Sequence, residues 1–230
     1  MKMFGFIINS FIGHKYKVIK RIPGFHYAPN IYGASWNKLH DPREDKEFFE
    51  LATKVRKCGT TSLYYDRLYT FYQLINQLKP KTILEAGVYK GGSAYFMASL
   101  APEAEFYAVD TFEGFKAEDN PDGHNSVGVF GDVSYEGVKF YLKPLKNVKV
   151  IKGRIQETGL NRNFDLIHLD MDIYEPTKWA LDNCKSKFIV VDDYNTISCP
   201  GIKKAVDEFL KENNYLCLNL LNGQAILIKI

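Results

Sequence analysis

TILEAGVYKGGSAYF, residues 82–96, decides the fold of this chain. Its first five residues are an apolar run of strand length, and its last six begin a helical pattern, so the segment predicts a β-strand, a tight turn and an α-helix. The turn contains Gly87, Gly91 and Gly92. Glycine lets a chain leave a strand sharply and lets its backbone approach a ligand closely. We therefore expect a ligand-binding turn here.

Strand-like and helix-like segments alternate around this stretch. Further strands are predicted at 105–110, 148–152, 164–170 and 187–192, and helices at 62–78, 91–100, 135–142, 176–184 and 200–212. Two closing strands, 215–221 and 224–230, flank Asn222-Gly223, which is a hairpin signal. The pattern predicts an α/β, Rossmann-like fold: a mostly parallel seven-stranded sheet with helices on both faces and an antiparallel C-terminal hairpin strand.

Length and composition limit the classes of protein that fit. The 230 residues allow one domain at 62–230 preceded by an N-terminal extension, 1–61, for substrate or oligomer contacts. A net charge of +3 does not favour nucleic acid as a partner. The apolar stretch within 1–13 is too short to span a bilayer, so we expect no transmembrane segment. Four scattered cysteines indicate reduced thiols and a cytoplasmic protein.

Acidic residues stand at the ends of several predicted strands: Glu85, Asp110, Asp170, Asp192 and Asp193. In open parallel sheets, ligands bind beyond the carboxyl ends of the strands. We therefore expect these five side chains to meet at one rim of the sheet.

The glycine turn resembles the cofactor-binding turn of S-adenosylmethionine-dependent methyltransferases. Glu85, just before Gly87, would repel a pyrophosphate but accept from the cationic amino-acid end of that cofactor. Ser93 is a donor in the first turn of the helix, and Asp110 is placed to bind both ribose hydroxyls. Tyr89, Thr111 and Asp170 complete this part of the predicted site. A glycine turn that only packs a helix on the sheet is the competing interpretation.

The turn after the third strand carries the predicted adenine contacts. Ile155 would flank the ring, Gln156 would hydrogen-bond it, and Gly153 would allow close approach. A plain surface turn explains the same residues, and both interpretations stay open.

The acids at the end of the fourth and fifth strands predict a metal site. Carboxylates crowded together raise one another's pKa unless a cation lies among them, and Mg²⁺ prefers oxygen ligands. We expect Asp170, Asp192 and Asp193 to hold Mg²⁺, with Asp170 and Asp172 as catalytic residues. Asp172, Glu175 or a water would take the proton of a substrate hydroxyl. Alternatively, Asp172 and Glu175 only favour the start of the helix at 176.

Four motifs taken together resemble the macrocin O-methyltransferase-type family: ILEAGVYKGGS, VDTFEGF, LIHLDMDIYEPT and IVVDDYN, within residues 64–215. The resemblance implies a class I methyltransferase fold, S-adenosylmethionine, magnesium at the three aspartates named above, and Asp172 as the base. It also implies a hydroxyl of a sugar or glycosylated small molecule as the acceptor. Family members usually have glycine at Met171, arginine at Lys90, and serine at Thr111 and Thr177.

Other interpretations remain at this point. Asp170-Met171-Asp172 is also a D-x-D motif, as in metal-dependent glycosyltransferases, and a non-catalytic ligand-binding α/β module is a third reading. Oxygen-dependent hydroxylases would need histidine at the metal, and His168 is expected in the core. The polar loop 116–134 is either a lid, with His124 touching substrate, or a plain solvated loop. A homo-oligomer is left open.

Overall fold

The computed structural model describes residues 45–116 and 128–230. Most of the predicted N-terminal extension, His124 and much of the loop 116–134 lie outside these described residues.

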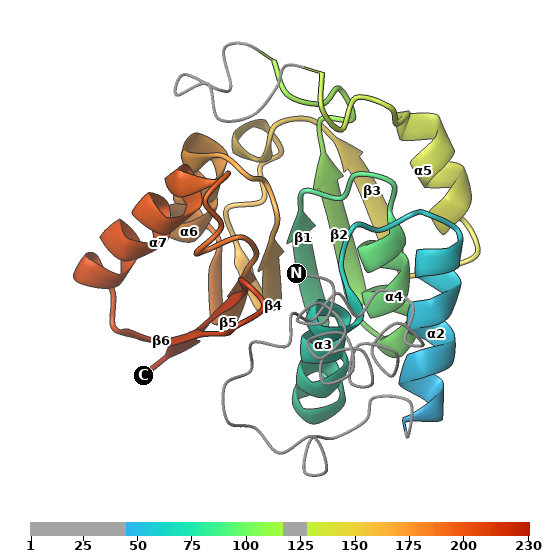
Figure 1. Ribbon diagram of the computed structural model, residues 1–230, viewed down its shortest axis with the longest axis horizontal. Helices are drawn as coiled ribbons and strands as arrows, with labels where there is room; N and C mark the ends of the chain where they lie inside the picture. Colours follow the sequence, from blue (N-terminus) through green and yellow to red (C-terminus); the bar gives the residue numbers. More distant parts are fainter. Residues whose placement is uncertain (1–44, 117–127) are drawn as a thin grey trace, which may run out of the picture.

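The described residues form a seven-stranded sheet, ordered β3-β2-β1-β4-β5-β7-β6 (Figure 1). The five strands from β3 to β5 pair in parallel, and β7 runs antiparallel to both β5 and β6. The predicted fold class is therefore confirmed. The strands are β1 Thr82–Ala86, β2 Glu105–Asp110, β3 Val148–Lys152, β4 Asn163–Leu169, β5 Lys185–Val191, β6 Tyr215–Asn219 and β7 Ala225–Lys229.

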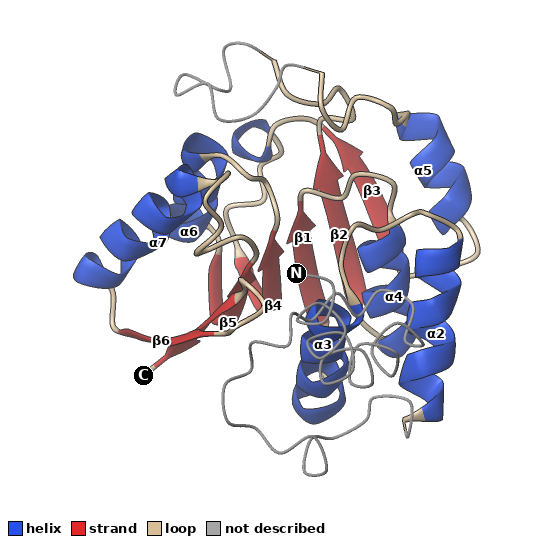
Figure 2. Ribbon diagram, viewed as in Figure 1, coloured by secondary structure: helices blue, strands red, loops and turns tan. Residues whose placement is uncertain are grey.

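Helices lie on both faces of the sheet (Figure 2). Alternate strand residues pack in opposite directions, as the period of two in a strand requires. Ile83 and Leu166 join a core with α2, α3 and α4, whereas Leu84 and Ile167 join a core with α6 and α7. The helices are α2 Lys46–Lys57, α3 Tyr65–Leu78, α4 Gly92–Leu100, α5 Tyr135–Leu142, α6 Tyr174–Asn183 and α7 Pro200–Glu212, and a short 3₁₀ helix, η4, spans Ile155–Glu157.

Helix α2 precedes the predicted domain start at residue 62 but shares the core of the domain. Its residues Phe48, Ala52 and Val55 are fully buried. The ring centroid of Phe48 lies 6.0 Å from that of Phe96 in α4 and 4.9 Å from that of Tyr69 in α3. The part of the predicted extension that the structure describes therefore packs as one body with the sheet, while the boundary at 61/62 stays a prediction.

Backbone hydrogen bonds continue the sheet just beyond the strand ends. Asp170 N–H donates to the Ala86 carbonyl at 2.9 Å, and Asp192 N–H donates to the Leu169 carbonyl at 2.9 Å. These bonds fix the carboxyl ends of β1, β4 and β5 side by side, so the residues that follow them gather at one rim. Within the described part of the chain, no helix is both long and apolar enough to cross a bilayer.

Candidate active site

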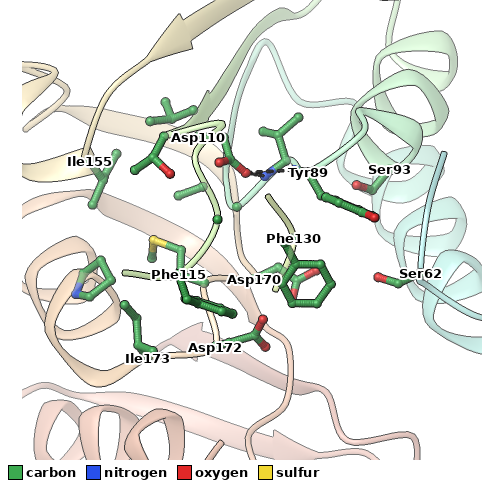
Figure 3. A pocket seen from close by; sticks show the side chains of 18 of the residues that line it. Ser62, Tyr89, Ser93, Asp110, Phe115, Phe130, Ile155, Asp170, Asp172 and Ile173 are labelled. Atoms are coloured by element: carbon green, nitrogen blue, oxygen red, sulfur yellow. Dashed lines mark hydrogen bonds between the residues drawn. The ribbon is translucent and has the colours of Figure 1, made fainter. Parts of the chain in front are cut away.

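A pocket opens at this rim, beyond the carboxyl ends of the central strands (Figure 3). Its wall is built from the segment 60–63, the turn after β1, the residues after β2 and β3, and the acidic stretch after β4. Of the predicted cofactor residues, the pocket is lined by Gly87, Tyr89, Ser93, Asp110, Thr111, Gly153, Ile155, Gln156 and Asp170.

The glycines of the turn after β1 are needed for contacts within the chain. Gly87 has φ +91°, and a Cβ there would lie 1.8 Å from the carbonyl oxygen of Asp170. A Cβ on Gly92 would lie 2.6 Å from the carbonyl of Thr60, which accepts a hydrogen bond from the Gly92 N–H. Gly91 and Gly92 are not among the pocket-lining residues. Close approach of one backbone segment to another, rather than to a ligand, explains these two contacts.

Asp110 organises the same turn from the end of β2. Its Oδ2 accepts from the backbone N–H groups of Val88 and Tyr89 at 2.7 and 2.8 Å, and its Oδ1 accepts from the Phe112 N–H at 2.8 Å. A carboxylate has about four acceptor positions, so one remains for a ligand in the pocket. Asp110 thus both shapes the turn and faces the space where a ligand would lie.

The predicted adenine residues also face the pocket. Ile155 is buried at the start of η4 and is drawn on the far side of the pocket from Ser93 in Figure 3. Gln156 lies beside it, and its side-chain Oε1 is buried without a hydrogen-bond partner. An unpaired buried acceptor is costly, and a ligand N–H donor would satisfy it.

Glu85 lies elsewhere than predicted. It is fully buried, is not part of the pocket wall, and faces the α3 side of the sheet. Its Oε1 lies 3.0 Å from Nδ1 of His168, the residue beside it on β4. The carboxylate therefore serves an internal pair rather than the cationic end of a cofactor.

His168 joins two carboxylates inside the protein. Its Nε2 lies 3.0 Å from Asp192 Oδ2, and its ring packs on Phe71 at 4.5 Å. Burial alone would lower the pKa of His168, but hydrogen bonds to Asp192 and Glu85 outweigh it and raise the pKa to about 10. The predicted core position is correct, and the side chain is held as a cation between two acids.

Arg67 brings a second cation to the acids, from α3. Its Nη2 lies 2.9 Å from Asp193 Oδ1 and its Nη1 3.8 Å from Asp192 Oδ1, while its Nε–H donates to the Asn222 carbonyl. Thr196 donates its hydroxyl to the same Asp193 oxygen at 2.8 Å. Burial opposes ionisation of Asp193, but the charge of Arg67 holds its pKa below the usual value. Nothing in the sequence around Arg67 distinguishes it from other surface arginines.

Two of the acids, Asp170 and Asp172, face the pocket and have pKa values that are raised rather than lowered. Burial, followed by the charges of Asp192 and Asp172, raises the pKa of Asp170 well above its usual value. Burial and the charge of Asp193 raise the pKa of Asp172 to about 7. Asp172 Oδ1 also accepts from the Cys199 thiol at 3.5 Å. The Asp172 carboxyl is therefore poised to hold or release a proton near neutral pH.

Two groups among the described residues have possible metal-ligand atoms within 4.8 Å of one another: His168, Asp170 and Asp192, and Asp172, Asp193 and Cys199. The predicted metal ligands are divided between these groups: Asp170 and Asp192 belong to the first, and Asp193 belongs to the second. Asp170 and Asp193 line the pocket, whereas Asp192 is 1% exposed behind them. His168 has both nitrogens engaged by carboxylates and so offers no free ligand atom.

The family model described as Macrocin-O-methyltransferase (TylF) matches residues 42–219, which is most of the chain. The chain belongs to the macrocin-O-methyltransferase family. It is an S-adenosylmethionine-dependent O-methyltransferase, which sets aside the glycosyltransferase and non-catalytic readings.

Solved structures share the fold of this family member at low sequence identity. The O-methyltransferase NovP is 20% identical, with a TM-score of 0.61 over 74% of this chain and 82% of NovP. The calicheamicin methyltransferase CalS11 is 20% identical, with a TM-score of 0.59 over 87% of this chain and 99% of CalS11. The Podospora anserina methyltransferase PaMTH1, solved with S-adenosylhomocysteine (SAH), is 18% identical, with a TM-score of 0.52 over 86% of this chain and 99% of PaMTH1. A search of curated proteins gave no match.

Proposed function

We propose that this O-methyltransferase methylates a hydroxyl of a sugar or of a glycosylated small molecule, with Mg²⁺ at the acidic end of the pocket. Support for a sugar comes from the family and from CalS11, which is described as a TDP-rhamnose 3'-O-methyltransferase (20% identity, TM-score 0.53, 83% of this chain and 96% of CalS11).

S-adenosylmethionine supplies the methyl group from a positively charged sulfur that makes it an electrophile. Several pocket residues fit this cofactor. Asp110 retains acceptor capacity for a ribose hydroxyl, and the Gln156 Oε1 needs a donor such as an adenine amino group. Ser93, in the first turn of α4, adds a hydroxyl at the other end of the site. The acids beyond it place negative charge where a cationic sulfur would lie.

The acidic end fits a divalent cation. The Oδ1 of Asp192 is buried without a hydrogen-bond partner, and the carboxyl of Asp170 is destabilised as an anion by burial and by the neighbouring carboxylates. Oxygen donors of this kind suit Mg²⁺, with Asp170, Asp192 and Asp193 as the predicted ligands. Bound there, Mg²⁺ would act as a Lewis acid that makes an acceptor hydroxyl easier to deprotonate. Arg67 and Thr196 donate to Oδ1 of Asp193, so its Oδ2 is the oxygen proposed for this role.

Asp172 is the proposed general base. With its pKa near 7, a substantial fraction of its carboxyl groups is ionised at neutral pH and can accept the hydroxyl proton. Cys199 donates to Oδ1 of Asp172, and Asp172 also shares a hydrogen bond with Asp193. With the cofactor bound, the acceptor oxygen would bond to the methyl carbon as the carbon–sulfur bond breaks, with SAH as the product. Asp172 then returns its proton to solvent.

The observation that carries this proposal is that one pocket contains both the ordered glycine turn and the acids with raised pKa. The test is transfer of labelled methyl from S-adenosylmethionine to TDP-rhamnose and to a panel of glycosides, with Mg²⁺ or with EDTA. We expect methylated sugar only with Mg²⁺. Full activity in EDTA would contradict the proposed role of the metal. Binding of SAH without methylation of any sugar would contradict the proposed class of acceptor. The cytoplasmic location and a homo-oligomer stay predictions.

A further inference from the structure

Three aromatic rings line one side of the pocket: Tyr89, Phe115 and Phe130, which we call the aromatic wall. Phe130 packs edge to face on both neighbours, with ring centroids 5.0 Å from Tyr89 and 5.7 Å from Phe115. In Figure 3 the rings of Phe115 and Phe130 are seen between the cofactor residues Asp110 and Tyr89 and the acid Asp172. The wall thus lies where the two ends of the pocket meet.

Backbone pairing holds two of the rings together across a gap of fourteen residues. The Phe115 N–H donates to the Val129 carbonyl at 3.1 Å, and the Gly128 N–H donates to the Phe115 carbonyl at 2.9 Å. Gly114 permits this pairing, because it has φ +67° and a Cβ there would lie 2.6 Å from the Val129 carbonyl.

Asp132 fastens the wall to the glycine turn. Its Oδ1 accepts from the Tyr89 hydroxyl at 2.7 Å, and its Oδ2 accepts from Lys90 Nζ at 2.6 Å. Hydrogen bonds to Lys90 and Tyr89 hold the pKa of Asp132 below its usual value, so the carboxylate stays charged at neutral pH. The position of Tyr89 is therefore coupled to the segment that carries Phe130.

The wall has features that packing alone does not explain. Tyr89 and Phe130 adopt left-handed backbone conformations, with φ +50° and +61°, which cost bulky residues on the order of 1 kcal/mol. Phe130 nevertheless leaves 37% of its surface exposed. An exposed ring on a strained backbone, beside polar groups in a pocket, is the arrangement expected where a ligand completes the burial.

We propose that the aromatic wall is the acceptor subsite and stacks on the C–H face of a pyranose ring, holding one of its hydroxyls toward Asp172; this rests on the proposed function. A sugar ring presents an apolar C–H face and a hydroxylated edge. The electron-rich face of an aromatic ring attracts such C–H groups and buries them, while nearby carboxylates accept from the hydroxyls. Apart from Tyr89, which lies in the glycine turn, the cofactor residues identified above lie along the other part of the pocket, so Phe115 and Phe130 act on the acceptor rather than on SAH.

The direct test is Phe130→Ala in the full-length protein, with Phe140→Ala as the matched control. Phe140 is 76% exposed on α5 and is not part of the pocket wall. The probes are methyl α-rhamnopyranoside and methyl β-glucopyranoside, added to SAH-loaded protein and followed by NMR saturation transfer from aromatic protein protons to ring C–H protons. We expect transfer in wild type and in the Phe140→Ala variant, reduced at least about threefold in the Phe130→Ala variant. SAH affinity should change by less than about twofold.

Two further variants test the wall without removing a ring. Gly114→Ala disrupts the Phe115–Val129 pairing, and Asp132→Asn weakens the attachment to Lys90. Both should lower saturation transfer in the same direction as Phe130→Ala, and circular dichroism and unchanged SAH affinity would show that the fold is retained.

Three results would overturn the inference: no saturation transfer to either glycoside in wild type, equal transfer in the Phe130→Ala and Phe140→Ala variants, or a larger loss of SAH affinity than of glycoside binding. Failure of the proposed function is distinct, because it shows as absence of SAH binding or of methyl transfer by wild type.

Discussion

The two ends of the pocket handle negative charge in opposite ways. At the glycine-turn end, Asp110 accepts three backbone N–H groups. At the acidic end, Asp170 and Asp172 have raised pKa values because they are buried among other carboxylates. Arg67 is paired with Asp193 and lies 3.8 Å from Asp192.

This difference separates binding from chemistry. A carboxylate fixed by backbone donors needs no rearrangement to accept from a ligand, whereas a group of acids with raised pKa values is completed by a cation or a proton. Substitutions at the first end should therefore change cofactor affinity, and those at the second should change turnover. The predictions below test that separation.

The largest effect is expected for Asp192→Asn. The amide keeps the volume and can still contact His168, but it removes the charge behind Asp170 and a proposed metal ligand. We expect kcat to fall about 1000-fold, since loss of a charge that acts on the transition state costs this order of magnitude. SAH affinity, measured by calorimetry, should stay within about twofold.

The control for that variant is Glu103→Gln, at an exposed position before β2. It makes the same change of charge outside the pocket and should leave kcat unaltered. A parallel loss of SAH affinity in the Asp192→Asn variant would show that the two ends are not separable.

Asp110→Asn is the reciprocal change. Its amide nitrogen would face a backbone N–H that the carboxylate now satisfies, which disturbs the turn at Val88 and Tyr89. We expect SAH to bind about 100-fold more weakly, because each lost charge-assisted hydrogen bond contributes about 1.5–3 kcal/mol. Mn²⁺ binding, followed by electron paramagnetic resonance as a substitute for Mg²⁺, should be unchanged. Glu105→Gln, at the exposed start of β2, is the control.

Arg67→Met tests the internal cation of the acidic end. The variant keeps most of the side-chain volume but leaves Asp193 without its ion pair. We expect the free energy of unfolding to fall by about 2 kcal/mol, less than for a fully buried pair because the Arg67 side chain is 18% exposed. Denaturant titrations with and without Mg²⁺ would measure this loss, and added Mg²⁺ should recover more stability in the variant than in wild type. If Mg²⁺ recovered the same stability in the variant as in wild type, Mg²⁺ and Arg67 would not be stabilising the same acids.

His168 predicts a pH-dependent effect on stability. Its pKa is raised from 6.5 to about 10 on folding, so the folded state binds the proton more tightly than the unfolded state does. The resulting stabilisation is complete below pH 6.5 and is lost as the pH rises through about 10. Without divalent metal, we expect the Tm to fall over this range, by about 2–4 °C for each kcal/mol of stability lost.

The matched variant is His168→Gln, which can hydrogen-bond but cannot carry the charge. Its Tm should lose most of the slope between pH 6.5 and 10, and a slope equal to that of wild type would assign the effect to another group.

The sequence was sufficient for the framework because the period of two and the turn signals are local. The predicted strands at 105–110 and 148–152 match β2 and β3, and Asn222-Gly223 does join an antiparallel hairpin. The convergence of Asp170, Asp172 and Asp193 on one pocket follows from the rule on strand ends.

The direction of each side chain was harder to predict. Glu85 is one residue from Ala86, which lines the pocket, but it points to the opposite face and meets His168. The role of a side chain on either face depends on which helices cover that face, and no local sequence pattern predicts this. Arg67 is similar: its partner Asp193 is far along the chain, and only the packing of α3 on the sheet brings them together.

The order of the strands has a consequence for biosynthesis. Among the described strands, β6 pairs only with β7, although β7 is made after it. On the ribosome, β6 must therefore wait unpaired until β7 emerges and enters between it and β5. Asp192 and Asp193 directly follow β5. This strand gains its second neighbour, β7, only at this late step. A nascent chain stalled before residue 225 should thus carry every proposed active-site residue and yet lack the support that holds two of them in place.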